Sequence, residues 1–189
     1  MTALAILVLC GSPADDSFLP LREGARLAYE VEDRSPGAAE PVRDVDAWVG
    51  AERKIGEEPW LEVSGFLGYE KAFLRSAADA VEFRLSAEEG APSLTLLKLP
   101  ARPGESWTGR LGADELRFRL AGEEHLETAA GLEKAVRVTF EAAKPELHAG
   151  HAATRGELWF AAGRGLVRAQ VTTDLDCHSA SVKVYRLKP

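Results

Sequence analysis

The sequence has few of the residues that cross-link small proteins or bind metals in them. Its 189 residues include two cysteines, four histidines and one methionine. The cysteines are Cys10 and Cys177, so acylation or removal of Cys10 would leave Cys177 without an intramolecular disulfide partner. A chain of this length buries enough apolar surface to fold without disulfides or structural metals. We therefore expect a domain that is stabilised by its apolar core.

Several catalytic motifs are also missing from the sequence. There is no glycine-rich phosphate loop with its Lys-Ser/Thr pair and no serine nucleophile elbow. The segment Gly163-Arg164-Gly165 lacks the third glycine and the βαβ setting of a dinucleotide site. We expect a non-catalytic protein without a cofactor. The enzymatic alternative requires a cleft that gathers His125, His148 or His178 with a carboxylate.

Positive charge is scarce in the sequence. Lys and Arg number 23 against 30 Asp and Glu, which gives a formal net charge of -7 at pH 7. A nucleic-acid binder needs a basic face that displaces counterions from phosphates. The arginines here are instead spread singly along the expected strands, as on a solvated sheet face. We therefore expect no nucleic-acid partner.

The histidines and cysteines do not have the spacing of a metal or catalytic site. His148 and His151 lie three positions apart, and residues at that spacing on a strand point to opposite faces. They could share a metal only on a turn or helical segment. Cys177 and His178 are adjacent, so on a strand they too face opposite ways and cannot readily act as nucleophile and base. We assign no metal site and no catalytic cysteine.

Long apolar runs are missing except at the beginning of the sequence. Residues 1–10 are apolar almost throughout and end at Cys10, which is too short for a membrane-spanning helix but matches the apolar core of an export signal. The run resembles the end of a bacterial lipoprotein signal, in which Cys10 becomes the acylated first residue. Two features depart from that pattern, because Leu9 replaces a small residue and no Lys or Arg precedes the run. The alternative is the first strand of a cytosolic protein.

On the lipoprotein interpretation, residues 1–17 are a leader and linker, and residues 18–189 form the folded domain. The protein would lie in the cell envelope or periplasm. Its contact with the membrane would be a lipid anchor on Cys10, if that residue is acylated.

The sequence is rich in short segments of alternating polarity. Leu27, Tyr29 and Val31 alternate with charged residues, which is the period of a strand with one buried face. Glycine and proline separate such segments at short, regular intervals. These patterns predict an all-β domain of roughly ten to twelve antiparallel strands with little helix. A single sheet of that size must curve strongly to hide one face, so we expect a half-barrel or clam-like shape.

A helix competes with a strand only in residues 76–89. Ser76 and Asp79 are suitable capping residues for a helix. Val81 and Phe83, however, alternate with Glu82 and other polar residues, and the neighbouring segments are strands. We therefore favour a strand.

One pattern of residues occurs twice. Residues 19–27 and 99–107 share Leu, Pro, Arg and Gly at the same spacing, with a large apolar residue three places after the glycine. In each copy the proline can end one extended segment and the glycine can open a turn into the next. The repeat predicts two similar half-sheets. The alternative is chance reuse of common turn residues.

The four tryptophans are candidates for both core and ligand contacts. Large rings fill the concave side of a curled sheet, so we expect these residues to lie in the core. The functional alternative is that they line a cavity for an acyl chain or another apolar ligand. The candidates for lining such a cavity are Trp48, Trp60, Trp107 and Trp159.

Together these segments resemble a family of bacterial envelope proteins described as lipoprotein-carrier-like or of the domain-of-unknown-function 3108 type. The matching segments are 19–24, 99–107, 131–138 and 159–168, where the last predicts a hairpin through Gly163 and Gly165. The resemblance implies a strongly curved antiparallel sheet in the cell envelope, with an apolar concavity. It implies no catalytic residue.

Two functional hypotheses follow. The first is a non-catalytic envelope protein that binds a lipid or another apolar ligand in the concave face of its sheet. The alternative is a structural or protein-interaction module with a fully packed core, which binds an envelope protein partner by its sheet edge or loops.

Overall fold

A computed structural model describes residues 17–112, 114–142, 153–174 and 180–189. They form one antiparallel sheet of 12 strands and a single short 3-10 turn, η1. The elements are β1 (Arg26–Asp33), β2 (Val42–Ile55), β3 (Glu58–Ser64), η1 (Phe66–Gly68), β4 (Ala72–Ala77), β5 (Ala80–Arg84), β6 (Leu94–Lys98), β7 (Ser106–Leu111), β8 (Asp114–Thr128), β9 (Gly131–Ala142), β10 (Ala153–Ala161), β11 (Gly165–Asp174) and β12 (Ala180–Leu187). The predicted all-β class and strand number are confirmed.

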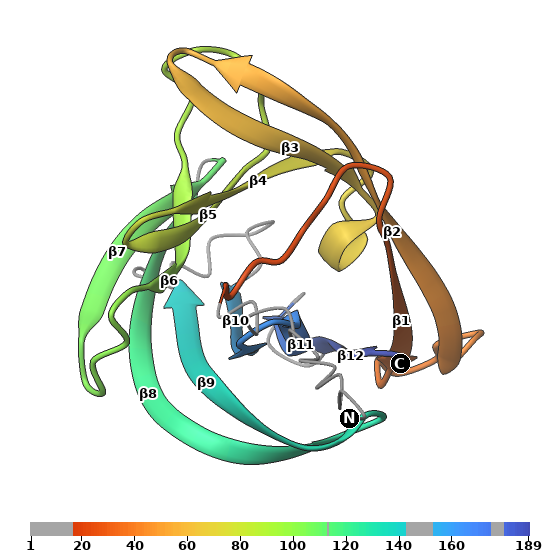
Figure 1. Ribbon diagram of the computed structural model, residues 1–189. Helices are drawn as coiled ribbons and strands as arrows, with labels where there is room; N and C mark the ends of the chain where they lie inside the picture. The colour runs from red at the N-terminus through yellow and green to blue at the C-terminus, as the bar shows by residue number, and fades with distance from the viewer. Residues whose placement is uncertain (1–16, 113, 143–152, 175–179) are drawn as a thin grey trace, which may run out of the picture.

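The sheet curls until its two edges face each other. Its strand order is β6-β5-β4-β3-β2-β1-β12-β11-β10-β9-β8-β7, so every strand lies beside its neighbours in sequence with one exception. The exception is β6 and β7, which follow each other in sequence but form the two edges, while β1 pairs with β12. The result is a nearly closed, barrel-like sheet (Figure 1). We call the boundary between β6 and β7 the seam.

Side chains, rather than a ladder of backbone hydrogen bonds, bridge the seam. The indole Nε1 of Trp107 on β7 donates to the carbonyl oxygen of Thr95 on β6 at 2.8 Å. The ammonium of Lys98 lies 3.3 Å from a carboxylate oxygen of Glu105. A Cβ at Gly109 would lie 2.5 Å from Cδ1 of Leu94, so the missing side chain lets Leu94 lie directly on β7. The two edges are therefore in contact without being paired.

The repeated segments form the same turn. In each copy the amide of the residue after the glycine donates to the carbonyl of the arginine, at 3.0 Å for Arg22 and 3.1 Å for Arg102. Gly24 and Gly104 have φ of 79° and 88°, which glycine adopts without steric cost. The positive φ at the third residue of the turn is typical of a type II turn.

The strands that follow the two turns also correspond. The amides of Gly24 and Gly104 donate to Val49 on β2 and Leu120 on β8, each at 2.8 Å. The register of β2 with β3 shifts directly after Val49, and that of β8 with β9 shifts directly after Leu120. Thus β1 and β2 correspond to β7 and β8. By the same correspondence the open seam is the counterpart of the paired junction between β12 and β1.

Residues 76–89 contain no helix. β4 and β5 form a tight hairpin in which Ala77 pairs with Ala80. The alternation of Val81 and Phe83 with polar residues therefore identified a strand correctly. The capping pattern of Ser76 and Asp79 instead marks the end of β4 and the turn that follows it.

Trp48 corrects the expectation that all four tryptophans lie in the core. Its neighbours Ala47 and Val49 are buried, whereas Trp48 is 51% exposed. Successive residues on a strand face opposite sides, so the inward positions of β2 are taken by the smaller residues. The guanidinium of Arg26, its partner in the register with β1, lies 5.7 Å from the centre of the indole ring.

A second buried cluster consists of Ile55, Trp60 and Phe73. Phe73 precedes Leu74 on β4, and Leu74 belongs to the main core, so Phe73 faces the other side of the sheet. The guanidiniums of Arg75 and Arg84 lie 5.0 and 5.2 Å from the centre of the Trp60 ring. Arginine stacked on an aromatic ring shields it from water while keeping its own charge. Trp60 is therefore buried outside the main core.

Candidate ligand cavity

The inner face of β8 to β12 is built from rows of residues that are paired across adjacent strands. The first row is apolar apart from one tyrosine hydroxyl, and every member is buried. It consists of Leu120, Val138, Leu158, Ala169 and Tyr185. This row forms a continuous floor across five strands.

Along the second row, from β8 to β12, the side chains change from aromatic rings to a lysine. It consists of Phe118, Phe140, Gly156, Val171 and Lys183. The rings of Phe118 and Phe140 are stacked with centroids 5.7 Å apart. A Cβ at Gly156 would lie 2.7 Å from Cζ of Phe140, so the ring occupies the space above the glycine. One side of the interior is thus lined by rings and the other by a lysine.

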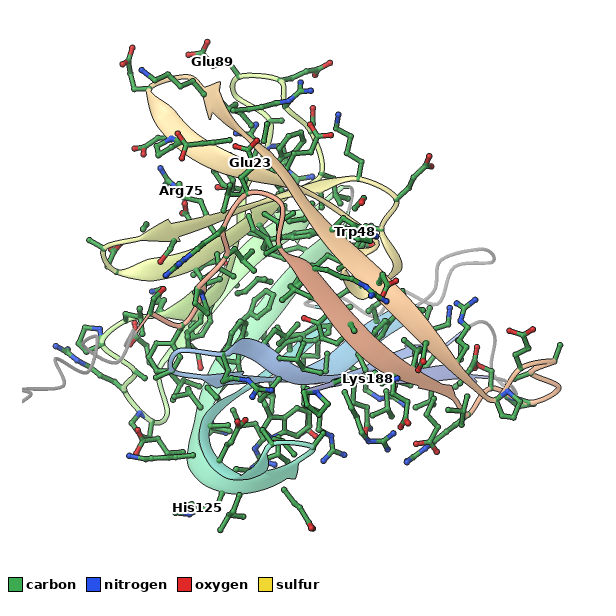
Figure 2. The ribbon with its side chains drawn as sticks, turned by 45° about the vertical axis from the view of Figure 1, so that its right-hand side comes forward. Glu23, Trp48, Arg75, Glu89, His125 and Lys188 are labelled. Carbon is green, nitrogen blue, oxygen red and sulfur yellow. The ribbon has the colours of Figure 1, made fainter. Side chains whose placement is uncertain are left out.

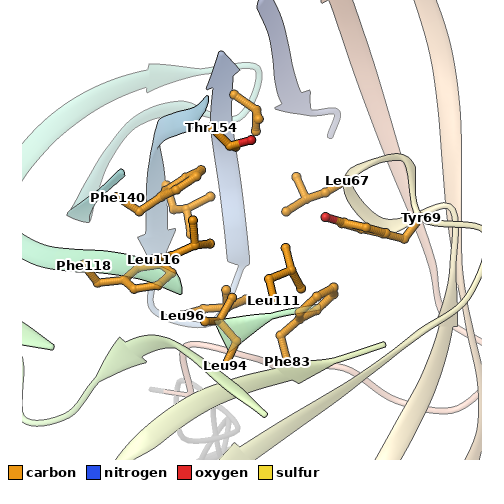
Figure 3. Close-up of a pocket in the computed structure, with 12 residues that line it drawn as sticks. Leu67, Tyr69, Phe83, Leu94, Leu96, Leu111, Leu116, Phe118, Phe140 and Thr154 are labelled. Atoms are coloured by element: carbon orange, nitrogen blue, oxygen red, sulfur yellow. The ribbon is translucent and has the colours of Figure 1, made fainter. Parts of the chain in front are cut away.

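An apolar cavity of about 90 Å³ lies against these rows. Figure 3 shows Leu67 and Tyr69 on one side of it, with Phe118 and Phe140 on the opposite side. Its lining residues are Leu67, Tyr69, Phe83, Leu94, Leu96, Leu111, Leu116, Phe118, Phe140, Thr154, Leu158 and Val171. Leu94 and Leu96 belong to β6, so one wall of the cavity is an edge of the seam.

A more polar cavity of about 260 Å³ adjoins the apolar one. The two share six lining residues, which are Leu67, Tyr69, Leu111, Leu116, Thr154 and Val171. The residues that only the polar cavity contacts are Asp114, Thr173, Ser181, Lys183 and Tyr185. We call this polar cavity the mouth. Together the two cavities form a space with an apolar end and a polar end.

The segment around η1 brings Leu67 and Tyr69 into the interior. The amide of Gly65 donates to the carbonyl of Tyr69 at 2.8 Å, which closes the turn. Gly65 has φ of 77°, and a Cβ there would lie 2.4 Å from the backbone oxygen of Asp46. Phe66 is fully buried and anchors the turn in the core. This local geometry requires glycine at position 65.

The two tyrosines of the mouth keep their protons over a wide pH range. Burial raises the pKa of Tyr69, and the negative charge of Asp114 raises it further. Burial is also the main cause that raises the pKa of Tyr185. Both phenols are therefore neutral hydrogen-bond donors near pH 7.

Lys183 and Asp114 supply the charges of the mouth. Neither forms an ion pair within the described part of the chain. Hydrogen bonds from Ser35 lower the pKa of Asp33, the register partner of Lys183, and the charge of Lys183 contributes in the same direction. Lys183 thus has a carboxylate nearby but none in direct contact.

The four predicted cavity residues lie elsewhere, since none of them is among the residues that line the apolar cavity or the mouth. Trp107 contacts a lining residue of the apolar cavity, because its ring stacks on Phe118 with a centroid distance of 5.7 Å. The indole of Trp159 donates to a carboxylate oxygen of Glu124 at 2.5 Å and contacts the guanidinium of Arg168. Trp48 is exposed and Trp60 belongs to the second cluster.

The sequence contains signals for two lining residues, Leu67 and Lys183, that were not among the predicted cavity residues. Two apolar residues, Phe66 and Leu67, stand between Gly65 and Gly68. Exposed turns usually contain polar residues, so an apolar turn indicates a segment that folds inward. Lys183 lies two positions before Tyr185 and therefore shares its face of the strand.

The remaining candidates give no assembled site. His125 is exposed on the outside of the β8–β9 hairpin (Figure 2). Cys10, His148, His151, Cys177 and His178 lie outside the described residues. Within the described ranges no group of three or more His, Cys, Asp or Glu side chains is placed to hold a metal ion. The same ranges contain no helix that is long and apolar enough to cross a membrane.

Comparison with known proteins identifies the fold. No protein-family model matches the sequence and no curated protein does, so membership of the domain-of-unknown-function 3108 type stays a prediction. The structure is similar to that of an inferred exported protein with a YmcC-like fold from Bacteroides fragilis, with a TM-score of 0.52, 13% identity and coverage of 92% of this chain and 100% of that one. It is also similar to an inferred lipoprotein from Parabacteroides distasonis, with a TM-score of 0.50, 14% identity and coverage of 92% and 99%. At these identities the likeness shows a shared fold.

Proposed function

We propose that this chain is a non-catalytic cell-envelope protein that holds the apolar part of a small ligand inside its curved sheet. The observation that carries the proposal is the apolar cavity, which adjoins a more polar mouth. Ligand sites are typically concave, mostly apolar and equipped with a few polar groups that fix orientation. Phe118, Phe140 and Leu116 give this cavity that character.

Straight-chain alcohols test the proposal. Burying one methylene contributes about 0.8 kcal/mol, so each added carbon should strengthen binding about fourfold until the apolar cavity is full. Isothermal titration calorimetry from 1-butanol to 1-decanol would measure this series. We expect an initial rise in affinity followed by a plateau, whereas no detectable binding across the series would overturn the proposal.

A pair of matched variants locates the binding. Leu116→Trp places a large ring in the apolar cavity and should weaken 1-octanol binding at least tenfold. Leu132→Trp makes the same chemical change at a side chain that is 72% exposed and lines neither cavity, and should leave binding unchanged. Equal weakening in both variants would mean that the alcohol binds elsewhere. Circular dichroism and thermal unfolding would establish that both variants are folded.

The envelope location and the lipid anchor are part of the proposal. They are supported by the apolar run that ends at Cys10 and by the description of the two structural neighbours as exported protein and lipoprotein. Expression of the full chain in a bacterium with radiolabelled palmitate should label the wild type and Cys177→Ala but not Cys10→Ala. Label that persists in Cys10→Ala, or no label in the wild type, would remove the anchor.

An exposed aromatic residue favours the alternative, a protein-interaction module. Trp48 and Val42 are 51% and 56% exposed, and the even spacing between them places both on the outer face of β2. Tryptophan is enriched at the centres of protein interfaces. A photo-crosslinking residue at position 48 should capture one defined envelope protein, while the same residue at position 132 should not. Absence of a defined product at position 48 would count against this function.

A further inference from the structure

We propose that the mouth binds an anionic head group, a carboxylate or a phosphate, through Lys183. The ligand would then be amphipathic, with its apolar part in the apolar cavity and its anion at β12. This inference rests on the proposed function, because it assigns the polar end of the same site. It adds the sign of the charge on the ligand and the residue, Lys183, that binds the charged group.

The register of β11 and β12 creates a gradient of polarity toward the mouth. The successive inward-facing pairs are Ala169 with Tyr185, Val171 with Lys183, and Thr173 with Ser181. The first pair belongs to the apolar floor, and the third carries two hydroxyls. Lys183 lies at the transition, in the same row as Phe118 and Phe140. A cation at that level can meet the head of a molecule whose tail lies against the rings.

Lys183 differs from the other cations at the end of the chain. Arg186 forms ion pairs with Glu30 and Glu32, and Lys188 pairs with Asp44. Lys183 has no such partner in the described part of the chain, although Asp33 is its register neighbour. Its ammonium therefore keeps three donors for an anion. A charge-assisted hydrogen bond in a partly buried site is stronger than one between neutral groups.

The other groups of the mouth fit an anion on the Lys183 side. Tyr69 and Tyr185 are neutral donors, and the hydroxyls of Thr173 and Ser181 stand beside Lys183. Among the residues that line the mouth the opposing charge is Asp114, which acts on Tyr69 and would repel an anion from that side. On the β12 side the carboxylate of Asp33 acts on Tyr185, and the charges of Lys183 and Arg43 both counter it. The arrangement thus orients the head group toward β12, because complementary charges select one of two possible orientations.

Four probes with one chain length test the sign of the charge. They are octanoate, octyl phosphate, 1-octanol and octylamine, each titrated by calorimetry at pH 7. We expect at least one of the two anions to bind the wild type about tenfold more tightly than 1-octanol, and octylamine to bind more weakly than the alcohol. Preference between octanoate and octyl phosphate distinguishes a fatty-acid head from a phosphate head.

Variants at Lys183 assign the effect to one side chain. Lys183→Met removes the charge at similar length and should abolish the preference for anions, while 1-octanol binding changes less than twofold. Lys183→Arg keeps the charge and should keep the preference. Lys54→Met is the matched control, because Lys54 is exposed and lines neither cavity.

The outcomes separate this inference from the proposed function. If 1-octanol binds but the anions bind no more tightly, or if Lys183→Met keeps the anion preference, the head-group assignment is wrong and the apolar site stands. Tighter binding of octylamine would assign the head to a carboxylate instead, either Asp114 or Asp33. If none of the four probes binds the wild type, the proposed function fails as well.

Discussion

Gly65 is a residue for which the fold allows no substitute. Its φ of 77° lies in the region that costs other residues roughly 1–2 kcal/mol. In addition, a Cβ would lie 2.4 Å from the backbone oxygen of Asp46, which cannot rotate away as a side chain would. Gly37 has almost the same φ, 76°, but no atom within 4 Å of its Cβ position. Comparing substitutions at these two glycines therefore separates the energetic cost of a strained φ from the cost of steric overlap.

We predict that Gly65→Ala destabilises the protein clearly more than Gly37→Ala does. Gly37→Ala should lower the free energy of unfolding by about 1 kcal/mol, the cost of the strained φ alone. Gly65→Ala should lower it by several kcal/mol, because β2 must move to admit the methyl group. Urea unfolding followed by circular dichroism would measure both. Equal losses would show that the Asp46 contact relaxes freely.

The lowered pKa of Glu32 predicts how the stability of the fold changes in acid. Hydrogen bonds from Arg34 and Arg186 lower the pKa of Glu32 to about 2. Because the folded-state pKa is below the ordinary value of 4.5, the charged carboxylate favours the folded state above pH 4.5, and this contribution is lost as the pH falls toward 2. Glu32→Gln should therefore unfold at lower urea than the wild type at pH 7, with a difference that shrinks at lower pH.

Glu141→Gln is the control for this titration. Glu141 is exposed and lies 3.7 Å from Arg117 in a surface pair, which should contribute little at any pH. If the Glu32→Gln difference stayed constant from pH 7 to pH 2.5, the stabilisation would come from the side-chain shape and not from its charge.

At the level of single residues the sequence was a partial guide. The alternation around Tyr29 and Val31 placed buried positions correctly, because period two follows directly from strand geometry. The prediction that Trp48 lies in the core was wrong, because it was based on the size of the side chain. Ala47 and Val49 on either side of it face inward, so Trp48 faces outward. The charge environment of Lys183 could not be read from sequence, since it depends on which strands are adjacent in the sheet.

At the level of elements the seam is the feature that distinguishes this sheet from a closed one. Its counterpart, the junction between β1 and β12, has a regular ladder from Tyr29–Leu187 to Asp33–Lys183. The seam has Trp107, Lys98 and Leu94 in contact across it, but no ladder joins β6 and β7. Amides without a partner in a ladder exchange with solvent readily.

We predict that amide hydrogens on the seam side of β6 and β7 exchange at least tenfold faster than those between β1 and β12. Hydrogen–deuterium exchange read by NMR resolves the two sets. Trp107→Phe removes the indole donor to Thr95 and should accelerate exchange in β6 further. Equal protection at the seam and at the β1–β12 junction would mean that the edges pair in solution.

Local sequence patterns predicted the strands and turns better than they predicted which strands pair with one another. The Leu-Pro-x-Arg-x-Gly pattern identified two equivalent turns, because proline and glycine act on the backbone nearby. The pairing of β1 with β12 joins opposite ends of the sheet-forming region. No short-range pattern encodes a contact at that separation, so the sequence could predict curvature but neither the order of strands nor the position of the seam.

At the scale of the whole molecule the apolar cavity lies between residues of the segment from β1 to β6 and residues of the segment from β7 to β12. Leu67, Tyr69 and Phe83 come from the first of these segments, whereas Leu116, Phe118 and others come from the second. The volume left between them depends on how these strands pack, which residue size alone does not determine. The sequence predicted a concave apolar face, and the structure supplied its boundaries.

A bound ligand should stabilise the whole sheet. At a free concentration of one hundred times its dissociation constant, octanoate should raise the free energy of unfolding by about 2.7 kcal/mol, since it binds the folded state alone. Thermal unfolding with increasing octanoate would measure this, and Leu116→Trp, with binding at least tenfold weaker, should reduce the increase to about 1.4 kcal/mol or less at the same concentration. A melting temperature that is unchanged at saturation would contradict binding to the native fold.

The pairing of β1 with β12 makes the strand order a cycle. The amide of Lys188 donates to the carbonyl of Ala28 at 2.8 Å, so the end of β12 lies beside the beginning of β1. A circular permutant that starts at β7, passes from β12 into β1 through a short linker and ends at β6 keeps every strand beside its present neighbours. Its new termini would fall at the seam, where no backbone ladder needs to be broken.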